Sequence, residues 1–356
     1  MAGLVFNTFS DPYVQFAFNL GLAAVALTVA MIVVIICLRL GLRKSQRLEK
    51  AFIDVWRPIL LLSISSKVKP DLPELPTSSL VFFLKLWIYL HESLRGSANE
   101  RLNEVALQLG CDEAARTLLK KGNRAERLLA ILTLAHLRDR KSWDALVVLS
   151  TRDDSLASIH AARALINIDP IEGTSLLLPM LLQRRDWDIA QLANFLGAAD
   201  QAFWLHLSKN ILQMDKALWT RALQLADALN LQLPLQSMQY IIQHCESTET
   251  LVAALRTASG PTLLPLVRGY LSHADWRVRV EAASFLGRFG DTEDAEALKA
   301  GLEDAQWWVR YASAEALANM PFFGTSQLLE LRECTHNTTS LAMLDHVLAE
   351  RRFLAL

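Results

Sequence analysis

The sequence feature that most constrains the fold is an internal repeat of 31 residues. Residues 275–286 and 306–317 align without a gap, and both contain a Val-Arg pair, at 278–279 and 309–310. In this register an anchor leucine recurs at positions 134, 165, 196, 229, 255, 286, 317 and 348. The steps are 31, 31, 33, 26, 31, 31 and 31 residues, so the 26-residue step predicts a shortened or distorted repeat. A constant period of this length indicates one structural unit that stacks on the next along the chain.

The spacing of apolar residues within the repeat indicates helices. Beyond residue 95 no strand-like alternation is found, and apolar residues recur at helical spacing between short breaks. The position three before the anchor is mostly small, which lets neighbouring helices approach closely. It is occupied by Ile131, Ala162, Ala193, Ala226, Val252, Ala283 and Ala314. The last copy has Asp345 there, as expected of a terminal repeat that has no next neighbour.

The pattern Asp-x-x-Val-Arg-x-x-Ala-Ala-x-x-Leu-Gly at residues 275–287 resembles the second helix of a HEAT repeat. The short period resembles the bacterial, phycobilisome-lyase-like HEAT type. This resemblance implies an all-α fold, an α-solenoid of about eight to nine HEAT-like helix pairs over residues 79–356. From the residues before it, one transmembrane helix is expected to precede this solenoid. It also implies that the arginine seven before the anchor (Arg127, Arg279 or Arg310) pairs with a turn acid of an adjacent repeat.

An apolar segment near the N-terminus predicts a membrane helix. Residues 20–38 contain one clearly polar side chain, Thr28, and are long enough for a hydrocarbon core of about 30 Å. A signal peptide is the alternative, but no lysine or arginine precedes Arg39 and no convincing cleavage site follows. We therefore expect a transmembrane helix at residues 14–38 after a short extracytoplasmic N-terminus at residues 1–13.

The segment after this helix sets its orientation. Residues 39–50 hold five basic residues against one acidic residue, so the N-terminus is predicted outside and the C-terminal part in the cytoplasm. Residues 39–78 are predicted to form a basic juxtamembrane segment, with a short helix interrupted by Pro58, and then a Pro-rich linker. The apolar residues 80–90 are too short to span and predict a buried first helix, with a helix lying in the membrane plane as the alternative.

Two further positions of the repeat are polar and lie three residues apart, on one helix face. They predict a continuous polar strip along the second helices, which by resemblance line the concave side of the solenoid. The strip is either a groove for a partner or a solvated face. Its candidate partner-binding residues are His160, Arg163, Gln191, Asn194, Gln224, Asp227, Glu281, Ser284 and Glu315.

Tryptophan also follows the register. Trp219, Trp276 and Trp307 stand ten before their anchors, at the start of the second helix, and Trp187 is one residue out of this column. These side chains either cover the rim of the core or, if exposed together, form an aromatic ridge for a partner, since aromatic residues are enriched at interface hot spots.

Motifs for catalysis and cofactors are scarce. The eight histidines form no HxxxH or HExxH pair, the four cysteines lie far apart, and P-loop, Gly-x-Ser-x-Gly and dinucleotide motifs are missing. No catalytic residue, metal site or cofactor is predicted. The net charge of −1 for the chain lacks the basic footprint of a nucleic-acid-binding protein.

These observations favour a single-pass scaffold of the inner (cytoplasmic) membrane whose cytoplasmic solenoid binds a protein at the membrane surface. A membrane glycosyltransferase of envelope or exopolysaccharide synthesis is a suitable partner. A HEAT-based enzyme of the chromophore-lyase type is the alternative, which the resemblance permits and the missing catalytic motifs oppose. Binding of DNA is disfavoured by charge.

Overall fold

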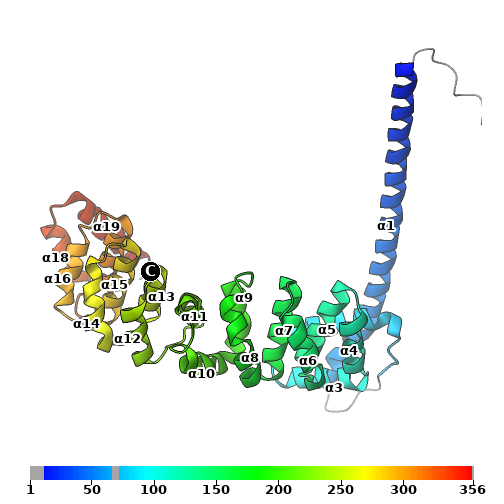
Figure 1. Ribbon diagram of the computed structural model, residues 1–356, viewed down its shortest axis with the longest axis horizontal. Helices are drawn as coiled ribbons and strands as arrows, with labels where there is room; N and C mark the ends of the chain where they lie inside the picture. Colours follow the sequence, from blue (N-terminus) through cyan, green and yellow to red (C-terminus); the bar gives the residue numbers. More distant parts are fainter. Residues whose placement is uncertain (1–11, 66–71, 355–356) are drawn as a thin grey trace, which may run out of the picture. The chain divides into compact units, whose positions relative to one another are not determined.

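The computed structural model describes residues 12–65 and 72–354. These residues form 19 α-helices, joined by turns and 3-10 helices, and contain no strand, which confirms the all-α repeat fold (Figure 1). The chain divides between Leu137 and Arg138 into two compact units. The C-terminal half of the first helix packs with the helices that follow it in the first unit.

Helix α1 (Pro12–Ser65) is a single helix of 54 residues. It runs through Pro58, so the prediction of a separate short helix interrupted there is wrong. Packing explains the continuity: Trp56 and Leu60, on either side of the proline, are buried in the core of the first unit. Their burial outweighs the hydrogen bond that a proline removes from a helix.

The stretch Phe18–Leu40 of α1 is 23 residues long, with a mean hydropathy of 2.9, and none of it is buried. By length and composition it is able to cross a membrane, although a signal sequence near an N-terminus passes the same test. Most of the predicted extracytoplasmic segment, residues 1–11, lies outside the described residues.

The rest of the first unit contains α2 (Leu80–Ser93), α3 (Ser97–Gln108), α4 (Cys111–Lys121) and α5 (Arg124–His136). Seven apolar residues of α2 are buried, which confirms the predicted buried first helix. Of the predicted linker, residues 66–71 lie outside the described residues, and Pro76 is extended before a short 3-10 helix at Thr77–Ser79.

The core of the first unit depends on large side chains rather than on the repeat pattern. Trp56 of α1 meets Phe83 of α2 edge-on, with ring centroids 5.1 Å apart. Trp87 is fully buried and donates its indole N–H to the carbonyl of Leu102, at 2.8 Å. This bond satisfies the polar atom that burial of a tryptophan would otherwise leave unpaired.

The second unit alternates first and second helices of the repeat. The first helices are α6 (Trp143–Ser150), α8 (Pro170–Gln183), α10 (Asp200–Asn210), α12 (Leu235–His244), α14 (Leu264–Val267), α16 (Asp294–Gly301) and α18 (Thr325–Cys334). The second helices are α7 (Ser155–Ile168), α9 (Ile189–Leu196), α11 (Trp219–Ala228), α13 (Thr248–Thr257), α15 (Trp276–Phe289), α17 (Trp307–Asn319) and α19 (Thr338–Leu354). Each second helix contacts the next one, so the seven form one layer.

The anchor leucines from Leu165 onward lie in the core of this arrangement, and Leu134 lies on α5 of the first unit. All but Leu229 are buried, and Leu229 is half-buried beyond the last residue of α11. The next residue, Asn230, has a φ of 53°, a left-handed conformation that ends the helix. Helices α12 and α13 that follow have 10 residues each, as α11 and α18 do, so helix length does not mark out the repeat that the 26-residue step predicts to be shortened.

Small residues and turn arginines join the later repeats. A Cβ added to Gly287 of α15 would lie 2.6 Å from the Cα of Ala316 of α17, so only glycine permits this close approach. Arg279 donates two hydrogen bonds of 2.8 Å to Asp304, in the turn before α17, which confirms the expected pairing with an adjacent repeat. Arg127 and Arg310 donate instead to nearby backbone carbonyls.

Candidate interaction surface

The layer of second helices presents the predicted polar strip to solvent. None of its nine candidate residues is buried: Gln191, Asn194, Gln224 and Glu315 are exposed, and His160, Arg163, Asp227, Glu281 and Ser284 are half-buried. They lie on α7, α9, α11, α15 and α17, and the helices of the layer contact one another in that order through α13. The strip is interrupted on α13, where Thr250 is buried and shares a 2.7 Å hydrogen bond with Thr220 of α11.

The middle of the strip carries both signs of charge. Glu281 forms an ion pair with Arg256 of α13, with Nε and Oε1 2.9 Å apart. The hydrogen bonds that Arg256 donates to Glu281, together with the charges of Glu281 and Asp227, raise the pKa of Arg256 above its ordinary value. Arg288 adds a guanidinium 5.3 Å from the ring of Phe289. Sequence analysis missed both arginines because neither occupies a polar column of the repeat.

Trp187 and Trp219 do not belong to an exposed ridge, because both are fully buried. The indole N–H of Trp187 donates to Ser158 of α7 at 3.2 Å, and that of Trp219 donates to the carbonyl of Ile211 at 2.8 Å. Each therefore joins its own helix to the preceding part of the repeat array. This corrects their assignment as partner-binding candidates.

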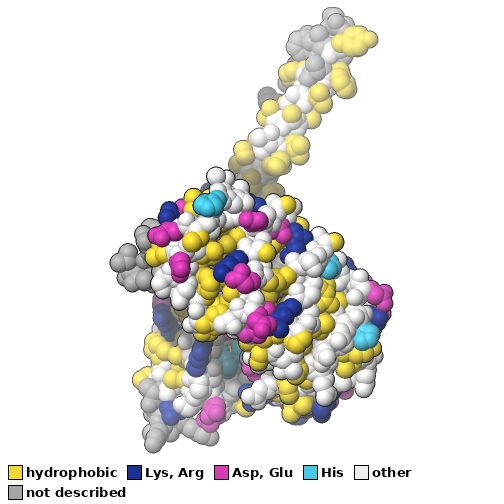
Figure 2. Space-filling model, turned by 90° about the vertical axis from the view of Figure 1, so that its left-hand side faces the viewer, with side chains coloured by type: hydrophobic (Ala, Val, Ile, Leu, Met, Phe, Trp, Pro, Cys, Tyr) yellow, Lys and Arg dark blue, Asp and Glu magenta, His cyan; other side chains and the backbone are white. Residues whose placement is uncertain are grey.

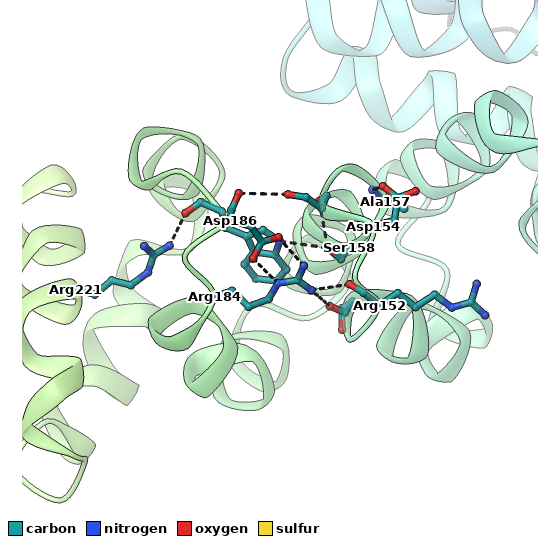
Figure 3. Close-up of polar contacts among 10 residues, drawn as sticks. Arg152, Asp154, Ala157, Ser158, Arg184, Asp186 and Arg221 are labelled. Atoms are coloured by element: carbon teal, nitrogen blue, oxygen red, sulfur yellow. Dashed lines mark hydrogen bonds and ion pairs between the residues drawn. The ribbon is translucent and has the colours of Figure 1, made fainter.

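Arginines complete the joint around Trp187 (Figure 3). Arg184 packs over the indole ring and donates to the carbonyls of Ser150 and Arg152, at 3.2 and 2.8 Å. It also pairs with Asp186, and this hydrogen bond is the main reason that the pKa of Asp186 falls to about 2. Figure 3 shows Arg221 of α11 reaching back to the same joint. These contacts are structural, since they satisfy carbonyls between repeats.

Trp276 and Trp307 are partly exposed, as an aromatic ridge for a partner requires. Their side chains are 36% and 42% exposed, and the neighbouring Trp308 is 56% exposed. Trp307 stacks flat on Tyr311, one helical turn further along α17, with ring centroids 5.3 Å apart and an interplanar angle of 5°. Trp308 meets Trp307 edge-on at 4.7 Å.

Helix α19 completes this aromatic group. The Tyr311 hydroxyl donates to Glu350 at 3.0 Å, and the ring of His346 lies 5.9 Å from that of Tyr311. Burial, the hydrogen bond with Glu350 and the charge of Glu315 raise the pKa of Tyr311 to about 12. The two surfaces that the sequence offered as alternatives therefore meet here, since Glu315 belongs to the strip and Trp307 to the ridge.

We call this group the aromatic–carboxylate patch and define it as Trp307, Trp308, Tyr311, Glu315, His346 and Glu350. Trp308, Tyr311 and Glu350 were not predicted. The signal for them was the four-residue spacing of Trp307 to Tyr311 and of His346 to Glu350, which places each pair on one helix face. Figure 2, which shows the side of the C-terminal repeats, shows both signs of charge interspersed with hydrophobic side chains.

A cavity lies in the first unit between α1 and α2. It is a half-open cavity of about 310 Å³. Its lining consists of Ile53, Arg57, Phe82, Lys85, Leu86 and Tyr89. Lys85 lies 3.3 Å from Glu49 of α1, so one of its two cations is already compensated.

Groups with catalytic or metal-binding chemistry are few among the described residues. No cluster of three His, Cys, Asp or Glu side chains that could hold a metal ion lies within the described ranges 12–65 and 72–354. Burial, with a contribution from Asp112, raises the pKa of the Cys111 thiol to about 12, so this cysteine is protonated and unreactive at neutral pH.

Comparison with known proteins identifies the repeat. A model of the HEAT repeats family matches residues 243–318, which include α13, α15 and all but the last residue of α17. No curated protein matches the chain. The crystal structure of an engineered protein is similar at 18% sequence identity and a TM-score of 0.36, covering 85% of this chain and 90% of that one. The match identifies HEAT repeats at residues 243–318, and the described helices on either side of them form further helical repeats.

Proposed function

We propose that the protein is a membrane-anchored scaffold whose HEAT repeats bind a partner protein in the cytoplasm. One observation carries the anchoring: the helix that exposes Phe18–Leu40 is the same helix that buries Trp56 and Leu60 in the first unit. An exposed apolar helix of this length is costly in water and stable in a bilayer. Because the helix is continuous, membrane insertion would hold the first unit beside the membrane.

The orientation is proposed from charge. Arg39, Arg43, Lys44 and Arg47 are exposed on α1 directly after the apolar stretch. Basic residues at the end of a membrane helix stay in the cytoplasm, which places the repeats there and the N-terminus outside. The membrane is then the inner, cytoplasmic membrane of a bacterial cell.

Binding of a partner is proposed from the repeats. Stacked helical repeats present extended surfaces of exposed side chains, and attachment to a membrane raises the effective concentration of partners in the same membrane. A membrane glycosyltransferase of envelope or exopolysaccharide synthesis fits this arrangement. The polar strip and the aromatic–carboxylate patch are the proposed contact surfaces.

Anchoring is tested by fractionating cells that express the full chain. Replacing Val29 and Val33 by arginine should release the protein from the membrane fraction, since each arginine at the centre of a span costs about 2.5–3.5 kcal/mol. The matched control is Val148→Arg on α6, which is 56% exposed against 53% for Val33. Release of the wild-type protein by alkaline carbonate would contradict the proposal.

Partner binding is tested by recovery from mild detergent with a tagged full chain. Replacing both Arg163 and Asp227 of the strip by alanine should reduce recovery of the partner about tenfold, which corresponds to ~1.4 kcal/mol. The control replaces Arg152 and Asp153, an exposed pair of the same charges in the turn before α7. If the double variant retains the partner fully, the strip is a solvated face.

A further inference from the structure

We propose that the aromatic–carboxylate patch binds an arginine or lysine side chain from a basic segment of the partner protein. This inference rests on the proposed function and names the chemistry of the partner that the patch accepts. The patch combines exposed aromatic rings with two carboxylates at the junction of α17 and α19. Aromatic faces and carboxylates both attract cations, and neither attracts an anion.

The aromatic half of the patch is exposed and held in a fixed arrangement. Trp308 exposes 56% of its surface, and Trp307 exposes 42% although Tyr311 covers one face of its ring. The parallel stacking on Tyr311 and the edge contact with Trp308, at 4.7 Å, restrict the orientation of Trp307. A cation that binds here pays little conformational entropy on the protein side, because the rings are already ordered.

The carboxylate half lies at the hydroxyl of Tyr311. Glu350 accepts a 3.0 Å hydrogen bond from this hydroxyl, and its side chain remains 47% exposed. Glu315 lies two turns beyond Trp307 on α17 and is exposed, and its charge contributes to the raised pKa of Tyr311. Two negative charges thus flank one aromatic ring.

No permanent cation of this chain neutralises these carboxylates within the described residues. Arg310 of α17 donates to the carbonyls of Asp304 and Ala305, and Arg351 of α19 donates to Asn319. His346 lies 3.4 Å from Glu350 and compensates it only when protonated. The patch therefore carries negative charge that a guanidinium or ammonium group from outside can neutralise.

Membrane proteins supply such groups where the proposed topology places the repeats. Their cytoplasmic loops carry an excess of lysine and arginine close to the membrane. Anchoring in the same membrane keeps the scaffold close to these loops and raises their effective concentration around it. Arginine suits the patch better than lysine, because its planar guanidinium stacks on an aromatic ring and donates two bonds to one carboxylate.

The test measures binding directly by titration calorimetry, with the full chain in detergent at low ionic strength. The probe is a short amidated peptide that contains several arginines, and its control is the same peptide with citrulline, which keeps the shape and removes the charge. We expect the arginine peptide to bind at least about tenfold more tightly than the citrulline peptide, and raised salt to weaken it.

Two variants locate the site. Trp308→Ala and Glu350→Gln should each weaken the arginine peptide several-fold or more, and Glu296→Gln, an exposed acid on α16, should leave it unchanged. Tyr311→Phe separates positioning from contact: it keeps the ring, releases Glu350 and should weaken binding less than Glu350→Gln does. Thermal melting of each variant verifies that the repeats remain folded.

Equal binding of the arginine and citrulline peptides would overturn the inference, as would unchanged affinity in both Trp308→Ala and Glu350→Gln. The outcome is separate from that of the proposed function. If a partner is recovered from membranes while the patch ignores the arginine peptide, the scaffold stands and this inference fails. If the peptide binds but the protein is not in the membrane, the proposed anchoring fails.

Discussion

The repeats around α9 and α11 and those around α15 and α17 use the tryptophan near the start of the second helix in opposite ways. Trp187 and Trp219 are buried: Trp187 donates its indole N–H to Ser158 of the preceding repeat, and Trp219 donates to the carbonyl of Ile211 at the end of α10, the first helix of its own repeat. Trp276 and Trp307 occupy equivalent positions and stay 36% and 42% exposed. The repeat register places a tryptophan at the start of the second helix but does not determine whether it is buried.

The difference follows from what holds each turn together. Around Trp187, Arg184 and Arg221 bond to backbone carbonyls, and the indole fills the space beneath them. Before α17 the turn is held by the ion pair of Arg279 and Asp304, so the indole of Trp307 is not needed there. A side chain released from a structural role in this way is available for binding.

The largest effect that would test this comparison is on stability. Trp219→Ala should lower the free energy of unfolding by about 3–5 kcal/mol, since it empties a fully buried site and removes the hydrogen bond to Ile211. Trp307→Ala should cost much less, because part of its surface is already in water. Chemical denaturation of both variants provides the measurement. Equal losses would show that the two halves of the column do not differ.

A close contact specific to the C-terminal repeats gives the next effect. Gly287→Val should cost about 1–3 kcal/mol or more, since the new Cβ would lie 2.6 Å from the Cα of Ala316 and force α15 and α17 apart. Gly197→Ala is the control, because nothing lies within 4 Å of a Cβ there. The shift in denaturation midpoint is measured for both. A tolerated valine would mean that the two helices can separate without loss.

The ion pair of the α17 turn predicts a smaller effect that depends on pH. Burial raises the pKa of Asp304, but hydrogen bonds from Arg279 and from the N–H of Gln306 outweigh burial and leave it below 3.8. Because the folded pKa is the lower one, this stabilisation is complete above pH 3.8 and is lost as the pH falls toward the folded pKa.

Replacing Asp304 by asparagine should therefore cost about 1–2 kcal/mol at neutral pH and flatten the acid limb of the stability profile. A double-mutant cycle with Arg279→Met separates this pair from its surroundings. Thermal melts between pH 3 and 7 test the prediction. A variant whose acid limb matches that of the wild type would assign that limb to other carboxylates.

The smallest expected effect on stability is that of replacing the exposed Trp308, and it separates a binding role from a structural one. Trp308→Ala should change the free energy of unfolding by less than about 0.5 kcal/mol, because a side chain that is 56% exposed and belongs to no buried core contributes little to stability. The same variant is expected to lose affinity for the arginine peptide. Melting curves and calorimetry on one preparation separate the two quantities. A large loss of stability would assign Trp308 to the structure rather than to binding.

The sequence predicted much of the fold because stacking imposes a period. The anchor leucines, the small residues before them and the pairing of Arg279 with Asp304 all follow from repeated contacts between identical units. The continuity of α1 through Pro58 was not predictable, because local propensity opposes it and the distant partners Phe83 and Leu84 decide it.

The candidate site was predicted only in part. The spacing placed the polar strip on the outside of one helix layer, and the structure confirms that none of its residues is buried. The sequence did not reveal that Tyr311 and Glu350 meet, since they lie on different helices and 39 positions apart. Contacts of this kind depend on how two helices cross, and the repeat pattern does not specify that.

The sequence alone was enough to predict the helical repeats, their register and the apolar stretch near the N-terminus. These features are periodic or local, so neighbouring residues encode them. Only the tertiary structure decided which tryptophans are buried, where the strip meets the aromatic residues and how α1 joins the first unit. Burial is a property of the space between helices, which residues far apart in the chain fill together.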